Sequence, residues 1–191
     1  MATELTEKQN FHAQTNIKAT FSTIDGSKQK EFSFHSIKQM GTFLRSNQIP
    51  KGWMMAVEDQ NLRHMDARGA DLNSVTFTNC CLDNVKMDGA RVDYLGIEGG
   101  TARGLSMQGS HGEGMSISGV EMPGVRLQGA QWSNGVIENS NMAGGQVDAT
   151  TTFDSVGFPG CQVPNDIIAM IPEGQAKTGP AEISQIGRAH V

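Results

Sequence analysis

Acidic, basic and imidazole side chains recur at intervals of twenty residues in the middle of the chain. One series is Asp71, Arg91, His111 and Gln131, and a second, two residues further on, is Asn73, Asp93, Glu113 and Ser133. A fold that stacks residues twenty apart places a carboxylate, a guanidinium and an imidazole side by side, which are ingredients of an acid/base or metal site. The alternative is a solvated wall of alternating charges. The elements that position these residues decide between the two.

Other residues with chemical potential give weaker signals. The three cysteines, Cys80, Cys81 and Cys161, form neither a disulfide framework nor a metal-ligand spacing. The sequence contains no nucleophile elbow and no phosphate-binding loop followed by a helix. Cys81 is expected to project outward, but no neighbouring base in the sequence would activate its thiol. We therefore expect a protein without catalytic residues, metal or cofactor.

Composition favours an extended shape over a compact globule. Of 191 residues, 37% are hydrophobic, 6% are aromatic and 23 are glycine. The net charge of −5 argues against nonspecific binding to nucleic acid or anionic membrane, which requires a basic surface. The N-terminal stretch "MATELTEKQN" lacks the features of a signal peptide, and the longest apolar runs are "WMMAV" and "IIAMI". These features predict a protein of the cytoplasm or another reducing compartment, with no membrane segment.

A period of five runs through the centre of the sequence. Counting in fives from Val57 to Thr152, eighteen of the twenty positions are apolar, and Gly112 and Thr152 are the exceptions. A second class of small or apolar residues lies two positions earlier in each unit. All eighteen charged residues of this region avoid both classes, as expected if both face inward. The predicted core contains Phe77, Leu82, Met87, Val92, Ile97, Met107, Ile117, Met122, Leu127, Trp132, Ile137 and Met142.

Glycine and asparagine mark the corners of these units. Two residues after each central apolar residue, from Gly69 to Gly144, ten of sixteen positions are Gly and four are Asn. Both residue types tolerate positive φ, which a type II turn requires at its third residue. Each pentapeptide is therefore predicted to form a short extended segment followed by a turn. The predicted corner glycines include Gly99, Gly104, Gly109, Gly114, Gly119, Gly124 and Gly129.

These units resemble the pentapeptide-repeat family, most clearly at "ADLNS" from Ala70 to Ser74. The resemblance covers roughly residues 55 to 153 and implies a right-handed quadrilateral β-helix with four pentapeptides per coil. Such a solenoid has about five coils and is about 24 Å long at the usual strand spacing. Residues twenty apart then stack on one flat side. Because a flat side has no pocket that excludes water, we favour the solvated wall over the acid/base or metal site.

The ends of the solenoid need caps, because a terminal coil exposes its edge. Residues 1–54 predict a small α+β cap: a hairpin around "DGSKQ", then a helix that Ser36 caps and that ends near Pro50. Residues 55–158 form the predicted β-helix, in which Phe153 and Phe158 shift the phase by one residue. Residues 159–172 are a predicted capping segment and 173–185 a tail or linker. Residues 186–191, "IGRAHV", resemble a translated sequencing adapter.

The resemblance implies a non-catalytic scaffold that binds a protein partner, because no catalytic motif competes with that interpretation. An alternative comes from family members that protect type II topoisomerases from quinolones by mimicking the outline and charge of duplex DNA. The acidic residues fit either function, although Lys86, Arg91, Arg103 and Arg126 interrupt them. We expect a protein partner and no direct contact with nucleic acid. The candidate interaction residues are Asp83, Asp88, Asp93, Glu98, Glu113 and Glu138.

Overall fold

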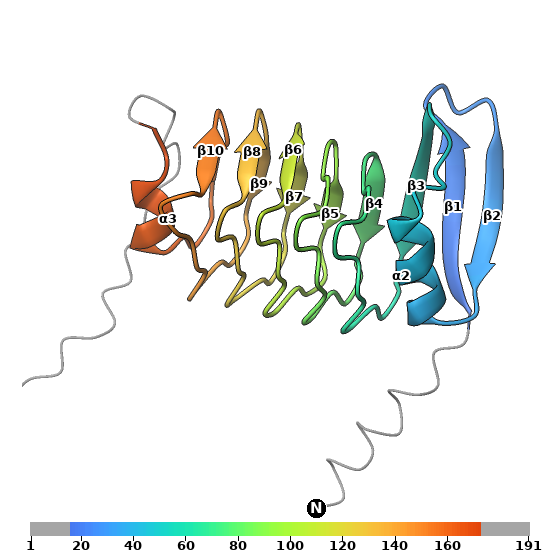
Figure 1. Cartoon of the computed structure of the whole chain (residues 1–191), viewed down its shortest axis with the longest axis horizontal. Helices are drawn as coiled ribbons and strands as arrows, with labels where there is room; N and C mark the ends of the chain where they lie inside the picture. Colours follow the sequence, from blue (N-terminus) through green and yellow to red (C-terminus); the bar gives the residue numbers. More distant parts are fainter. Residues whose placement is uncertain (1–15, 173–191) are drawn as a thin grey trace, which may run out of the picture.

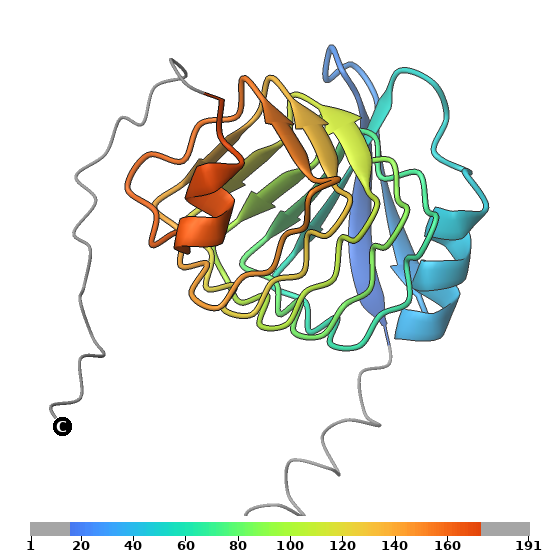
Figure 2. The same ribbon diagram turned by 60° about the vertical axis from the view of Figure 1, so that its left-hand side comes forward.

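The computed structural model describes residues 16–172, which form a β-solenoid with additional elements at both ends (Figure 1). Figure 2 shows the coils stacked along one axis, with helix α3 (Asn165–Ala169) covering one end. This arrangement confirms the predicted fold class, a mainly β quadrilateral solenoid with α+β elements at its N-terminal end.

Hydrogen bonds between coils pair residues twenty apart on four sides of the solenoid, and twenty-one apart in the last coil. The first side is a seven-stranded sheet in the order β2-β1-β3-β4-β5-β7-β9, and the fourth side is a three-stranded sheet in the order β10-β8-β6. Single bridges join the coils on the second side, beginning with Asn61 and Cys81, and on the third side, beginning with Asp66 and Lys86.

The strands within the solenoid are short, because each one ends where the chain turns a corner. On the first side they are β3 (Trp53–Glu58), β4 (Val75–Thr78), β5 (Gly96–Glu98), β7 (Ser116–Ser118) and β9 (Val136–Glu138). On the fourth side they are β6 (His111–Glu113), β8 (Gln131–Ser133) and β10 (Thr152–Asp154).

Both classes of inward residue build a narrow core along the solenoid axis. All twelve residues of the predicted core lie in it, each no more than 2% exposed. Trp132 fits at a wide position because its partner in the preceding coil is Gly112, which has no side chain. The indole N–H of Trp132 reaches back to that coil and donates to the hydroxyl of Ser110, at 3.0 Å.

The corners adopt the backbone conformation that their residue types favour. All sixteen positions from Gly69 to Gly144, including the seven predicted glycines, have positive φ. At many corners a hydrogen bond also closes the turn, as from the N–H of Ala70 to the carbonyl of Ala67 at 3.1 Å. Ser74 and Tyr94 occupy the same conformation without being Gly or Asn, so the position in the coil dictates the turn.

The N-terminal elements extend the first side and close one end of the core. Strands β1 (Ile17–Thr23) and β2 (Gln29–Phe34) form the predicted hairpin, and β1 pairs antiparallel with β3 of the first coil. Helix α2 (Ile37–Arg45) begins where the hydroxyl of Ser36 accepts the N–H of Gln39. The helix lies close against the first coil at Gly41, where a Cβ atom would be 2.6 Å from the carbonyl oxygen of Asp66.

The C-terminal coil contains the predicted shift in phase. Thr152 pairs with Gln131, twenty-one residues earlier, so the inward position passes from Thr152 to Phe153, which is 1% exposed. The hydroxyl of Thr151 fills the inserted turn by donating to the carbonyl of Leu127. Helix α3 then places Ile167 in the core.

Several expectations concern residues beyond this range. The predicted tail at 173–185, the adapter-like 186–191 and the first fifteen residues lie outside the described residues, and the proposed segment boundaries stay predictions. Within residues 16–172, no helix has the length and apolar character needed to span a bilayer.

Candidate protein-binding face

The second side of the solenoid corrects one member of the predicted interaction surface. Asp83 was expected to face solvent, yet it is only 3% exposed. Arg63 in the preceding coil and Arg103 in the following coil close over it, with guanidinium nitrogens 2.8 and 3.7 Å from Oδ2. The backbone N–H of Arg103 donates to its other oxygen at 2.9 Å. Asp83 therefore joins three coils and is unavailable to a partner.

The electrostatics of Asp83 agree with a structural role. Burial by itself raises the pKa of this carboxyl group. The N–H of Arg103 and the guanidinium of Arg63 outweigh burial and leave the pKa below its ordinary value. The ionised form is consequently favoured in the folded protein.

We expect Asp83→Asn to lower the free energy of unfolding by about 1 to 3 kcal/mol at neutral pH, the scale of hydrogen bonds to charged groups. Because the folded-state pKa is depressed, this contribution is present above the unfolded pKa of about 3.9 and is lost as pH falls through the folded value. Urea unfolding at pH 7 and pH 3 measures it. The exposed Glu121→Gln is the control, and equal effects of the two substitutions at pH 7 would contradict the assignment.

The third side is a mixed surface of acidic and basic residues, in which the buried Nε of Arg126 has no hydrogen-bond partner among the described residues. Arg68 forms a two-nitrogen ion pair with Asp66 and holds the pKa of that carboxyl well below its usual range. Asp88, a candidate interaction residue, accepts the hydroxyl of Ser106 and the N–H of Gln108. Asp88 is only half-buried, but these bonds commit it to holding adjacent coils together.

The fourth side brings together the residues spaced by twenty. Bridges and strand pairs align Asp71, Arg91, His111 and Gln131 in one column. Arg91 forms an ion pair with Asp93, which also accepts the N–H of Glu113 at 3.0 Å. The arrangement matches the solvated wall. Among residues 16–172, no group of three or more His, Cys, Asp or Glu side chains is placed to hold a metal ion.

The first side differs from the other three in its charge. Strand pairing aligns one column of outward residues, which in coil order is Glu58, Thr78, Glu98, Ser118 and Glu138. The neighbouring column contains the uncharged Ala56, Thr76, Gly96, Ser116 and Val136. Strands β3, β4, β5, β7 and β9 contain no Lys or Arg. We call the outer surface of these five strands the acidic face.

The geometry of the acidic face follows from the coil spacing. Its glutamates occur in every second coil, so they are about 9.6 Å apart along the axis. Glu98 is exposed, and Glu138 is half-buried and accepts the hydroxyl of Ser118 at 3.1 Å. Glu113 is exposed on the adjacent fourth side, where Asn134 donates to it. Glu58 was not among the predicted interaction residues, although it lies forty residues before Glu98 in the same phase of the repeat.

The four basic residues that were expected to interrupt the negative surface lie elsewhere. Arg103 is on the second side, Lys86 and Arg126 are on the third, and Arg91 is on the fourth. In the sequence these residues alternate with the acidic ones, but in the coil they face other sides, and a partner meets one side at a time. The acidic face is therefore uninterrupted by cations within the solenoid strands.

The cysteines have ordinary structural surroundings. Burial raises the pKa of Cys80 to about 11 and also raises that of Cys161. Both thiols donate to backbone carbonyls, of Val57 and Ile137 respectively. Cys81 is half-buried on the second side and accepts the hydroxyl of Thr101 at 3.4 Å.

Comparison with known families identifies the repeats that form these coils. The family model "Pentapeptide repeats" matches residues 59–91, with 8 copies. Residues 59–91 are pentapeptide repeats. The resemblance to the pentapeptide-repeat family is thus confirmed, and the matched residues cover the first coils on all four sides.

Solved structures that match this chain include forms of QnrB1, a plasmid-mediated fluoroquinolone resistance protein. One trypsin-treated variant is 16% identical, with a TM-score of 0.43, over 56% of this chain and 64% of that one. A second trypsin-treated variant, with a different substitution, is 19% identical, with a TM-score of 0.28, over 56% and 63%. The full-length form is 11% identical, with a TM-score of 0.18, over 61% and 81%. The chain spans under two thirds of the length of each trypsin-treated variant, and no curated protein sequence matches it.

Proposed function

We propose that this pentapeptide-repeat protein is a non-catalytic scaffold whose acidic face binds a basic surface of a partner protein. The observation that supports this proposal is the segregation of charge. The other three sides contain Arg or Lys beside their acidic residues, whereas the only charged residues in the strands of the acidic face are glutamates.

The construction of the solenoid suits it to such binding. Backbone hydrogen bonds join each coil to the next, as from the N–H of Gly99 to the carbonyl of Ser118 at 2.8 Å. The glutamates are thus held on a rigid support, so little conformational entropy is lost when a partner binds. A surface whose charges are all negative increases the rate of association with a basic surface and disfavours acidic partners.

The proposal predicts a side-specific and salt-sensitive contact in extracts of cells that make the protein. A photo-crosslinking amino acid at Ser116, within the acidic face, should give a discrete adduct with a basic protein. The same group at Gln108, exposed on the third side, should not. Raising the salt concentration should reduce the Ser116 adduct because salt screens exposed charges. Equal adducts from both positions, or an adduct insensitive to salt, would contradict the proposal.

A type II topoisomerase is a second candidate partner, favoured by the absence of cations from the acidic face. A DNA mimic requires a continuous negative surface that enters a basic groove. The test is inhibition of supercoiling by purified gyrase at two salt concentrations, with wild type and with Glu98→Gln/Glu138→Gln. Salt-sensitive inhibition by wild type alone supports this candidate. If neither protein inhibits gyrase, the topoisomerase candidate is rejected. The scaffold proposal is then tested by the crosslinking experiment.

A further inference from the structure

Within residues 16–172, the N-terminal end of the long sheet exposes a strand edge that pairs with no other strand. Strand β2 is last in the sheet order and lies at the outer edge of the molecule (Figure 1). Gln29 to Ser33 are all exposed. The N–H of Thr23 donates to the carbonyl of Lys28 at 3.0 Å, which fixes these two residues as a hydrogen-bonded pair. Such pairs alternate along an antiparallel ladder. The backbone groups of Gln29, Glu31 and Ser33 therefore point away from β1, toward the open edge.

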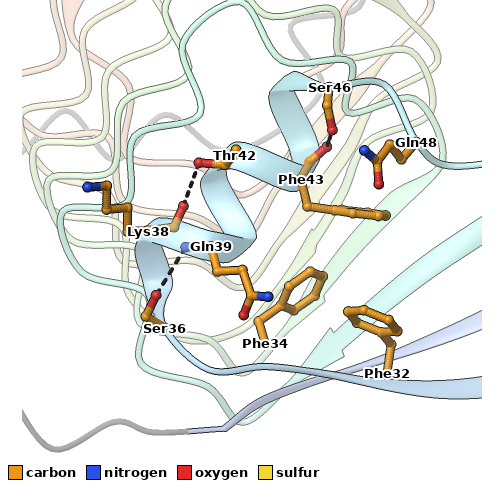
Figure 3. Close-up of a pocket in the computed structure, with 9 residues that line it drawn as sticks. All are labelled: Phe32, Phe34, Ser36, Lys38, Gln39, Thr42, Phe43, Ser46 and Gln48. Atoms are coloured by element: carbon orange, nitrogen blue, oxygen red, sulfur yellow. Dashed lines mark hydrogen bonds between the residues drawn. The ribbon is translucent and has the colours of Figure 1, made fainter.

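An aromatic groove lies beside this edge, between β2 and α2. Its volume is about 520 Å³, and Figure 3 shows Phe32, Phe34 and Phe43 along it. Phe32 is 41% exposed, although its ring packs against Phe34 with centroids 5.0 Å apart. An exposed aromatic residue next to free backbone donors and acceptors is typical of a surface that pairs with another strand.

We propose that β2 pairs antiparallel with β2 of a second copy of this chain, with Phe32 on the two-fold axis. In that register Glu31 and Ser33 of each copy form hydrogen-bonded pairs with Ser33 and Glu31 of the other. The two Phe32 residues face each other as a non-hydrogen-bonded pair, in which side chains approach most closely. Both rings lie on the groove side, so each copy contributes to covering the other's groove.

The charges of β2 select this register over its neighbours. Moving the two-fold axis from Phe32 to the preceding residue would put Glu31 opposite Glu31 of the second copy. Moving it one residue further would put Lys30 opposite Lys30. Like charges directly opposite destabilise a strand pair. Moving the axis from Phe32 to the following residue would bring Gln29 opposite Ile37, the first residue of α2, and Lys30 opposite Ser36, its N-cap, where no strand is available. With Phe32 on the axis, each Lys30 faces Phe34 of the second copy.

The dimer would join the long sheets of two copies into one continuous sheet across the two-fold axis. The two acidic faces would then lie on the same surface of that sheet, at opposite ends of a longer rod. This inference rests on the edge and groove of β2 and does not depend on the proposed function.

Analytical ultracentrifugation of the full chain tests the proposal. The expected species is a concentration-dependent dimer of about 41 kDa, twice the chain mass of 20.5 kDa. Ser33→Pro removes an outward N–H without breaking a hydrogen bond to β1, and proline is tolerated on edge strands. This variant should be monomeric, whereas Ser33→Ala should dimerise like wild type. A wild type that stays monomeric, or a Ser33→Pro dimer of unchanged affinity, would overturn the proposal.

Cysteine cross-linking tests the register independently of affinity. Facing residues of a non-hydrogen-bonded pair lie within disulfide distance, whereas diagonal residues are too far apart. In a background with Cys81→Ser and Cys161→Ser, Phe32→Cys should form a covalent dimer on oxidation and Ser33→Cys should not. Thermal melts of the reduced proteins establish that both variants are folded. A covalent dimer from Ser33→Cys alone would overturn the proposed register.

Discussion

Ile117→Asp is expected to abolish cooperative folding. Ile117 is 1% exposed and is aligned with Ile97 in one neighbouring coil and Ile137 in the other. A carboxylate there would be buried in an apolar stack that offers it no cation and no free donor. Burying an unpaired charge costs more than the whole stability of a typical domain unless the group is neutralised, so the coil cannot close around it.

The measurement is a thermal melt followed by circular dichroism, with Ser116→Asp as the matched control. Ser116 is the adjacent residue of β7, exposed and without a charged neighbour in its column. The control should melt within a few degrees of wild type, because surface substitutions usually change stability by about 0.5 kcal/mol or less. Similar melts for the two variants would show that the inward phase is assigned incorrectly.

Gly100→Ala should produce the second largest loss, about 2 to 5 kcal/mol of unfolding free energy, because strain and overpacking act together. Gly100 has φ +77°, and a Cβ atom there would lie 2.2 Å from the carbonyl oxygen of Cys80. The clash is with backbone of the adjacent coil, which cannot move aside like a flexible side chain. The coils would have to separate at the bridge between Cys81 and Thr101.

Gly119→Ala separates conformational strain from the clash. Gly119 also has positive φ, +64°, but a Cβ atom there would meet nothing within 4 Å. Its replacement should cost about 1 to 2 kcal/mol, the scale of a single residue held in the left-handed region. Urea midpoints compare the two variants. If Gly119→Ala is as destabilising as Gly100→Ala, close packing between coils is not what requires glycine at position 100.

The fold was predictable from the sequence because one period governs several independent features. Apolar residues, corner glycines and the avoidance of charge all follow the same count of five. Even the shift at Phe153 was visible, since one extra residue moves the next apolar position by one. Ser36 likewise predicted the start of α2, because capping is a local interaction.

The candidate site was less predictable, because a period does not show which side chains cover one another. Asp83 occupies an outward phase, but the arginines twenty residues before and after it fold over its carboxylate. The spacing of Arg63, Asp83 and Arg103 contained that signal. The groove beside β2 depends on how α2 packs against the first coil, which no local pattern specifies.

The most direct test of whether the acidic face is the binding surface is an affinity measurement at several salt concentrations. The ligand is the partner protein that crosslinks to position Ser116. Glu98→Gln/Glu138→Gln should weaken binding about tenfold, the equivalent of about 1.4 kcal/mol, and flatten its dependence on salt. The charge-matched control, Glu121→Gln/Asp166→Asn, removes two exposed acids from other surfaces and should bind like wild type. Equal weakening by both double variants, or a wild-type affinity that does not change with salt, would contradict the account.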